Sequence, residues 1–211
     1  TLNHIFIELY YLNVTIFISA VKIGTSANFQ GEGYIEISSD KFPRQNRRAQ
    51  ENLTVTITTT EPNGLIIWQG QKPDSHIKAT SDYFAVAVVD GYLEFSYDLG
   101  DKPGVLRSLL PVNDGYPHDI TVSRNGKHGK LKVDQQAEVS GLSGGGLKIL
   151  NVMGNIFVGG VPDMKRYTDN TFSKNFNGCV SNLRLFGSNN LDFGVDALGG
   201  LNVVSCETRP F

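Results

Sequence analysis

An Asp-Gly dipeptide, Asp90-Gly91, stands between two runs of strand-forming residues and constrains the fold of this chain more than any other feature. Asp-Gly is a strong signal for a two-residue hairpin, because both turn residues must adopt positive φ angles. With that turn, Val89 lies opposite Tyr92, and counting outward places Asp82 opposite Leu99 at the open end of the hairpin. A carboxylate and a main-chain carbonyl then converge where the ladder ends. This is the beginning of a site for a hard cation.

The rest of the chain, from about residue 33, alternates strand and turn signals. Residues 53–58 alternate apolar and threonine side chains, which is the period of a half-buried strand. Asn63-Gly64 precedes the apolar run 65–68, which suits a strand buried on both faces with Trp68 in the core. Further strand-like runs lie at 34–37, 120–123, 131–134, 156–160 and 180–186. No stretch sustains a helical period, so the pattern predicts an all-β fold, a two-sheet antiparallel sandwich or jelly roll.

Composition places this chain among globular proteins and limits its partners. Its 211 residues are 40% hydrophobic and 19% charged, with a net charge of −2, so nothing favours a nucleic-acid partner and anion binding requires a local patch. Two basic clusters could provide one: Lys41, Arg44, Arg47 and Arg48 in a proline-containing loop, and Arg124, Lys127, Lys130 and Lys132 around the hairpin at 120–134. Either cluster could hold a sulfated glycan, or could simply be solvated.

Two cysteines and two glycosylation sequons bear on the compartment. Cys179 and Cys206 could be two buried thiols or one disulfide. Asn13-Val14-Thr15 and Asn52-Leu53-Thr54 are acceptor sequences for N-glycosylation. Together these features favour a secreted protein with one disulfide.

The first 30 residues differ from the rest of the chain. Residues 5–23 are mostly apolar but carry Glu8 and Asn13, and they lack the basic start and the methionine of a signal peptide. We expect residues 1–30 to be a tail or the remnant of a preceding segment, with a truncated signal sequence or an added strand as alternatives. The domain itself is expected to span residues 31–211.

Catalysis is not expected. The four histidines show no metal-binding spacing such as H-E-x-x-H, and there is no G-x-S-x-G nucleophile motif. Strand acids such as Glu36 and Glu94 are isolated, whereas glycoside hydrolysis needs a pair of carboxylates.

Four segments together resemble a laminin G-like domain, also called an LG or LNS domain, over roughly residues 33–206. They are residues 64–70 (GLIIWQG), the hairpin 82–99, residues 157–162 (FVGGVP) and residues 177–183 (NGCVSNL). Within the family the chain looks most like members from basement-membrane proteoglycans. The resemblance implies a laminin G-like, concanavalin A-like jelly roll, and it makes Cys206 the disulfide partner of Cys179.

The resemblance also implies a calcium site on one rim of the jelly roll. Its ligands would be the Asp82 side chain, the Leu99 carbonyl, the Ile149 carbonyl and the Asn151 side chain. Many relatives carry Asp at the last position, so Asn151 lowers the charge but keeps an oxygen donor. With four protein oxygens and one formal charge, we expect a weak extracellular site with a Kd of about 10⁻⁴ to 10⁻³ M, in which water or an acidic ligand completes the coordination.

The function implied by the resemblance is recognition in the extracellular matrix of basement membranes. Such a secreted domain would bind cell-surface receptors or acidic glycans, of the dystroglycan, integrin, heparin or sulfatide type, with help from calcium. Membranes would be contacted only through receptors or glycolipid. The alternatives are a synaptic or hormone-binding LNS module that binds a protein partner or an apolar ligand, and a structural spacer.

Overall fold

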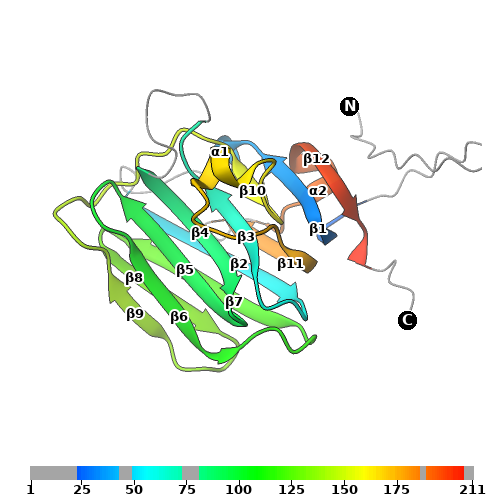
Figure 1. Ribbon diagram of the computed structural model, residues 1–211, viewed down its shortest axis with the longest axis horizontal. Coiled ribbons are helices and arrows are strands. Elements are labelled where there is room, and N and C mark those ends of the chain that lie inside the picture. The colour runs from blue at the N-terminus through cyan, green and yellow to red at the C-terminus, as the bar shows by residue number, and fades with distance from the viewer. Residues whose placement is uncertain (1–22, 43–48, 73–80, 186–188, 207–211) are drawn as a thin grey trace, which may run out of the picture.

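The computed structural model describes residues 23–42, 49–72, 81–185 and 189–206, which are almost entirely β-structure, as predicted (Figure 1). The strands are β1 (Ser26–Ile37), β2 (Gln50–Thr58), β3 (Gly64–Gln69), β4 (Asp82–Val89), β5 (Tyr92–Leu99), β6 (Gly104–Pro111), β7 (His118–Asn125), β8 (His128–Val133), β9 (Val139–Leu142), β10 (Ile156–Val158), β11 (Asn177–Leu185) and β12 (Ala197–Val204). Short helical segments are η1 (Ser39–Lys41), α1 (Met164–Thr168) and α2 (Phe193–Asp196). None of the helices in the described ranges has the length and hydropathy needed to cross a bilayer.

The strands form one continuous antiparallel sheet that curls into two layers (Figure 1). Its order is β6-β5-β4-β3-β10-β1-β11-β2-β7-β8-β9, and β12 pairs with β1 beside this path. Strand β1 belongs to both layers, because residues 35–37 pair with β10 while residues 26–30 pair with β11. The two ends of the order, β6 and β9, pack against each other. This closure produces the jelly-roll sandwich that the sequence predicts.

The β4–β5 hairpin has the register expected from its turn. Asp90 and Gly91 adopt φ angles of 50° and 84°, and Val89 pairs with Tyr92. The pairing continues without interruption to Asp82 and Leu99 at the open end. The turn chemistry therefore fixes which residues meet at the rim of the sandwich.

The hydrophobic core lies between the two layers, and a second apolar cluster covers the outer face of β3, β4 and β10. Trp68, 1% exposed, lies in this outer cluster, where its ring stacks on Tyr83 with 5.1 Å between centroids and meets Phe172 edge-on at 6.0 Å. Met164 and Tyr167 of α1 pack on the same cluster. Strand β3 is consequently buried on both faces, which confirms the expectation for residues 65–68.

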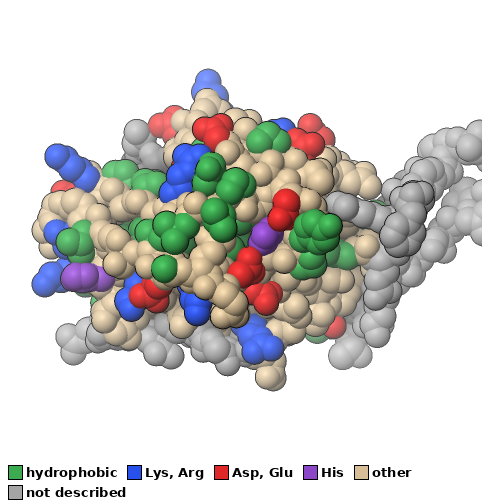
Figure 2. All heavy atoms as spheres, turned by 90° about the horizontal axis from the view of Figure 1, so that it is seen from below, with side chains coloured by type: hydrophobic (Ala, Val, Ile, Leu, Met, Phe, Trp, Pro, Cys, Tyr) green, Lys and Arg blue, Asp and Glu red, His purple; other side chains and the backbone are tan. Residues whose placement is uncertain are grey.

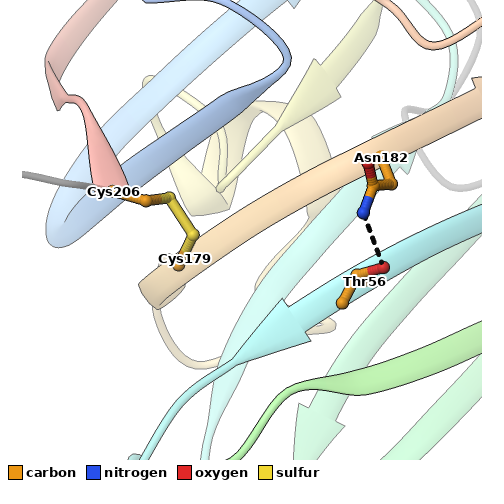
Figure 3. Close-up of a disulfide and its surroundings, with 4 residues drawn as sticks. All are labelled: Thr56, Cys179, Asn182 and Cys206. Atoms are coloured by element: carbon orange, nitrogen blue, oxygen red, sulfur yellow. Dashed lines mark hydrogen bonds between the residues drawn. A yellow bond between two sulfur atoms is a disulfide. The ribbon is translucent and has the colours of Figure 1, made fainter.

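A disulfide joins Cys179 of β11 to Cys206, just beyond β12, with 5.7 Å between the Cα atoms (Figure 3). The expected pairing is thus confirmed. On the same strand, Asn182 Nδ2 donates a hydrogen bond to Thr56 Oγ1 of β2 at 3.3 Å. A covalent bond therefore holds β11 to the segment just beyond β12, and a polar contact holds it to β2.

The sandwich begins earlier than residue 31. Strand β1 starts at Ser26, and Ile23, Ala27 and Phe29 are buried in the core. Residues 23–30, which the sequence analysis assigned to the preceding segment, are part of the domain because β1 must be long enough to serve both layers. Residues 1–22 lie outside the described residues, and Asn13 with them.

Candidate metal centre

Four sequence-predicted ligands define what we call the rim site: Asp82, Leu99, Ile149 and Asn151. Asp82 opens β4 and Leu99 closes β5, and the hairpin register pairs them. Ile149 and Asn151 lie in the segment between β9 and β10. The structure brings this segment to the hairpin, because Asp82 Oδ2 accepts a hydrogen bond from the backbone N–H of Asn151 at 2.9 Å.

The Asp82 carboxylate is held in an environment that disfavours its charge. The residue is 8% exposed, and burial raises the pKa of its carboxyl. The hydrogen bond from Asn151 and the charge of Arg124 lower the pKa, while the neighbouring charge of Asp98 raises it further. The net direction is a rise, so burial and the charge of Asp98 outweigh the hydrogen bond from Asn151 and the charge of Arg124.

The segment 148–151 is fixed from three directions. Leu150 is fully buried in the core, which leaves Ile149, 43% exposed, and Asn151 on the outer side. Gln71 Nε2 donates to the Asn151 carbonyl at 2.5 Å, and Arg124 Nη1 donates to the Lys148 carbonyl at 3.1 Å. Contacts within the protein therefore hold the backbone of this segment, and the roles of Ile149 and Asn151 as ligands stay a prediction.

The donors at the rim site are carboxylate, amide and carbonyl oxygens. Within the described ranges, no group of three His, Cys, Asp or Glu side chains converges to hold a metal. A cation at the rim would thus depend on main-chain and amide oxygens around a single carboxylate. These hard oxygen donors fit Ca²⁺, which accepts carbonyl ligands and flexible geometry, better than they fit zinc.

Arg124 is not a surface anion-binding residue, which corrects the sequence-based assignment. Its side chain is fully buried, as is that of Glu51, and Arg124 Nη2 and Nε both lie 2.5 Å from Glu51 Oε2. Strands β2 and β7 pair these residues directly. Because Arg124 follows Ile120 and Val122 on the inward face of β7, it cannot reach a ligand in solvent.

The other members of the predicted glycan-binding set have different positions. Lys127 Nζ donates to the Gly145 carbonyl at 2.5 Å, and Lys130 Nζ pairs with Glu138 at 2.8 Å on the surface. Arg44, Arg47 and Arg48 lie outside the described residues. Asn52 is exposed on β2, so its sequon is accessible, and its glycosylation stays a prediction.

A pocket of about 240 Å³ opens on the outer face of the sandwich where β3 ends. Its wall is formed by Glu36, Trp68, Gln71, Lys72, Phe157 and Tyr167. We call it the aromatic pocket. The sequence alone does not predict it, since it depends on strands β1, β10 and β3 lying side by side.

Exposed apolar side chains are spread over several elements. Val105, Leu109 and Leu110 of β6 and Leu142 of β9 are each more than half exposed. On the face shown in Figure 2, hydrophobic side chains occur in several groups separated by polar and charged ones. This distribution gives no single broad apolar interface on that face.

Comparison with known proteins gives a consistent family assignment. A model of the family described as "Laminin G domain" matches residues 57–190. The basement membrane proteoglycan of Caenorhabditis elegans is 41% identical over 182 residues, covering 86% of this chain and 5% of that protein. The basement membrane-specific heparan sulfate proteoglycan core protein of Mus musculus is 33% identical over 159 residues, covering 75% of this chain and 4% of that protein. The chain thus spans a small part of the length of these relatives.

Solved structures support the fold independently. Domains LG4-5 of the mouse laminin alpha1 chain superpose with a TM-score of 0.72, at 18% sequence identity, covering 90% of this chain and 49% of that chain. At this identity the match concerns architecture alone. It agrees with the jelly roll described above.

Proposed function

Because this chain belongs to the laminin G domain family, we propose that it recognises acidic glycans or receptors through a calcium ion held at the rim site. The domain is a secreted module of the extracellular matrix, as are its relatives among basement-membrane proteoglycans. Binding within the matrix is the general role of such a domain. We propose in addition that calcium assists the binding and that the partners are acidic. We propose no catalytic role.

The observation that carries the proposal is the state of Asp82. Its carboxylate is nearly buried, and that burial raises its pKa despite the hydrogen bond from Asn151 and the nearby charge of Arg124. A divalent cation would supply positive charge, and Leu99, Ile149 and Asn151 could add oxygen ligands. We expect a Kd of about 10⁻⁴ to 10⁻³ M, as in extracellular modules.

Three side chains have distinct roles in this arrangement. Asp82 supplies charge, Gln71 holds the Asn151 carbonyl, and Arg124 holds Lys148 next to Ile149. A bound calcium ion keeps coordination positions open to exchangeable water, which a carboxylate of a partner can occupy. With calcium bound in this way, the rim would accept acidic chains.

The partner class follows from this chemistry. Uronic-acid glycans of the dystroglycan type, integrins, and sulfated ligands such as heparin or sulfatide carry the anionic groups that the site would recognise. Electrostatic attraction would raise the association rate more than the final affinity, and salt would weaken it.

Chromatography of the 211-residue chain on immobilised heparin and on dystroglycan-type glycan tests the proposal, with calcium and with EDTA. Retention that is lost in EDTA is the expected result. EDTA-insensitive retention by a protein ligand would instead support a synaptic or hormone-binding type of module. Absence of retention on every ligand would indicate a spacer and overturn the proposal.

A further inference from the structure

The aromatic pocket is built by a row of residues across three neighbouring strands. Glu36 of β1 pairs with Phe157 of β10, and Phe157 pairs with Trp68 of β3. Residues paired in this way project from the same face of a sheet. Tyr167 of α1 closes one side by contacting Phe157 edge-on, with 4.9 Å between the ring centroids. The result is a concave site with an aromatic wall and one carboxylate.

Trp68, one of the residues that line the pocket, carries an unsatisfied buried donor. Trp68 is 1% exposed, and its Nε1 has no hydrogen-bond partner. A buried N–H without a partner destabilises the protein and calls for an explanation. Since an indole N–H can only donate, the group that completes it must be an acceptor, such as a hydroxyl, ether or carboxylate oxygen.

The polar groups of the pocket carry both signs of charge. Asn155 Nδ2 donates to Glu36 Oε1 at 2.8 Å, which orients that half-buried carboxylate and leaves Oε2 able to accept from a hydroxyl. Lys72 lies exposed at the mouth and supplies a cation. Hydroxyl, ring and carboxylate groups on one small molecule would match Glu36, the aromatic wall and Lys72 together. An acidic sugar has this combination.

The pocket is connected to the rim site by one side chain. Gln71, which is 4% exposed, lines the pocket and donates from Nε2 to the Asn151 carbonyl. A single hydrogen bond therefore separates the two sites. A glycan chain that engages the rim could place a neighbouring residue in the pocket.

We propose that the aromatic pocket is a second subsite. It binds one acidic sugar residue of a glycan, while the carboxylate of a neighbouring sugar in the same glycan engages the rim. This inference rests on the proposed function for its glycan, but the pocket itself does not require calcium. The sugar oxygen accepts from Trp68 Nε1, its hydroxyls donate to Glu36, and its carboxylate pairs with Lys72.

Trp68 provides a direct readout, because it is the only tryptophan in the chain. Its indole N–H gives one resonance in a proton–nitrogen correlation spectrum, and its fluorescence reports on the same ring. Sodium glucuronate is added through the millimolar range, with glucose as the uncharged control, in calcium and in EDTA. We expect glucuronate to shift the indole resonance saturably in both conditions, and glucose to act more weakly.

The Lys72→Gln variant tests the cation without touching the buried aromatic wall. We expect its affinity for glucuronate to fall about three- to tenfold, the loss of one exposed charge-assisted contact. The matched control Lys102→Gln, at an exposed lysine between β5 and β6, should bind as the unmodified chain does. An unchanged affinity in Lys72→Gln would remove Lys72 from the subsite, and with it the acidic-sugar assignment.

A uronic-acid oligosaccharide separates this proposal from the proposed function. If it binds in a calcium-dependent manner while the Trp68 resonance stays unmoved, the rim function stands and the subsite is wrong. If the Trp68 resonance moves equally in calcium and in EDTA and calcium adds no affinity, the subsite stands and the calcium-assisted mode is wrong. Movement of the resonance together with a calcium-dependent gain in affinity supports both.

Discussion

The carboxylate of Asp82 and the backbone amide of Asn151 are joined by a 2.9 Å hydrogen bond, although 69 positions separate the two residues in the chain. This bond fastens the segment before β10 to the open end of the β4–β5 hairpin. The bond joins two of the predicted ligand residues of the rim site through protein groups alone. An ion that binds there would not have to order this segment itself.

Replacement of Asp82 by Asn should separate calcium binding from folding. Without calcium, Asp82→Asn should be as stable as the unmodified chain or more stable, because the amide oxygen still accepts from Asn151 and no buried charge remains. In calcium at about 10 to 100 times Kd, only the unmodified chain should gain about 1.4 to 2.7 kcal/mol of unfolding free energy. Urea denaturation with and without calcium measures both effects.

The matched control for this experiment is Asp90→Asn. Asp90 lies at the opposite end of the same hairpin, where its φ of 50° suits Asn equally well. This variant should keep the full calcium response. Calcium stabilisation that survives in Asp82→Asn would exclude Asp82 as a ligand.

Calcium affinity should fall in mildly acidic solution. Burial, with the nearby charge of Asp98, raises the pKa of Asp82 above its ordinary value of 3.8. A raised pKa favours the folded state below the unfolded pKa, and that contribution is lost as pH rises through the folded pKa. Calcium requires the ionised carboxylate, so its affinity should decline as pH falls through the same range. Calorimetric titrations at several pH values check this, and an affinity that stays constant to below about pH 4 would contradict it.

Breaking the Arg124–Glu51 pair should cost much more than breaking a surface pair. Both side chains are fully buried, so Arg124→Met leaves the Glu51 charge uncompensated, at a cost of roughly 3 to 5 kcal/mol. Lys130→Met breaks the exposed pair with Glu138 and should cost less than about 1 kcal/mol. Urea denaturation measures both. A Glu51→Leu, Arg124→Met double variant should lose less unfolding free energy than the sum of the losses in the two single variants. Strictly additive losses would argue against direct coupling of the two side chains.

His118 should make the stability of the domain depend on pH near neutrality. Its Nδ1 lies 2.7 Å from Asp134 Oδ2 and its Nε2 lies 3.0 Å from Asp114 Oδ1. Burial lowers the pKa of His118, but the hydrogen bonds and charges of Asp134 and Asp114 outweigh burial and raise it. The resulting stabilisation is complete below the unfolded pKa of about 6.5 and is lost as pH rises through the folded pKa.

The measurement compares the unmodified chain with His118→Gln by urea denaturation at about pH 6 and about pH 9. The unfolding free energy of the unmodified chain should exceed that of His118→Gln by a larger margin at the lower pH. We expect the margin to change by about 1 kcal/mol or less between the two pH values. His128→Gln, the same change at an exposed histidine of β8, serves as the control. If this difference in unfolding free energy instead grows as pH rises, His118 is held in its neutral form.

The hairpin could be predicted from the sequence because its information is local. Asp90-Gly91 sets the turn, and the turn sets the partnership of Asp82 with Leu99. Asn151 could be assigned only through family resemblance, since nothing near residue 151 identifies a partner so far away in the chain. The burial of Trp68 was correctly expected, because an apolar run of four residues suits a doubly covered strand.

Arg124 shows where local reasoning failed. The local sequence groups Arg124 with nearby cations, yet Glu51, 73 positions away, is its partner. The alternation of Ile120, Val122 and Arg124 did carry a signal for an inward side chain, and it was outweighed by the charge. Helix α1 escaped notice for a different reason: its five residues are too few for a helical period, and it is held by the Asp163 cap and by packing on the outer cluster.

The bond between Cys179 and Cys206 also has a mechanical consequence. Tension applied to the chain beyond Cys206 passes through sulfur into β11, which is flanked by β1 and β2, and does not peel β12 from β1 one hydrogen bond at a time. The load then falls on β11, which is hydrogen-bonded to β1 on one side and to β2 on the other. The disulfide therefore passes force from that end of the chain into the middle of the sheet and spares the pairing of β12 with β1.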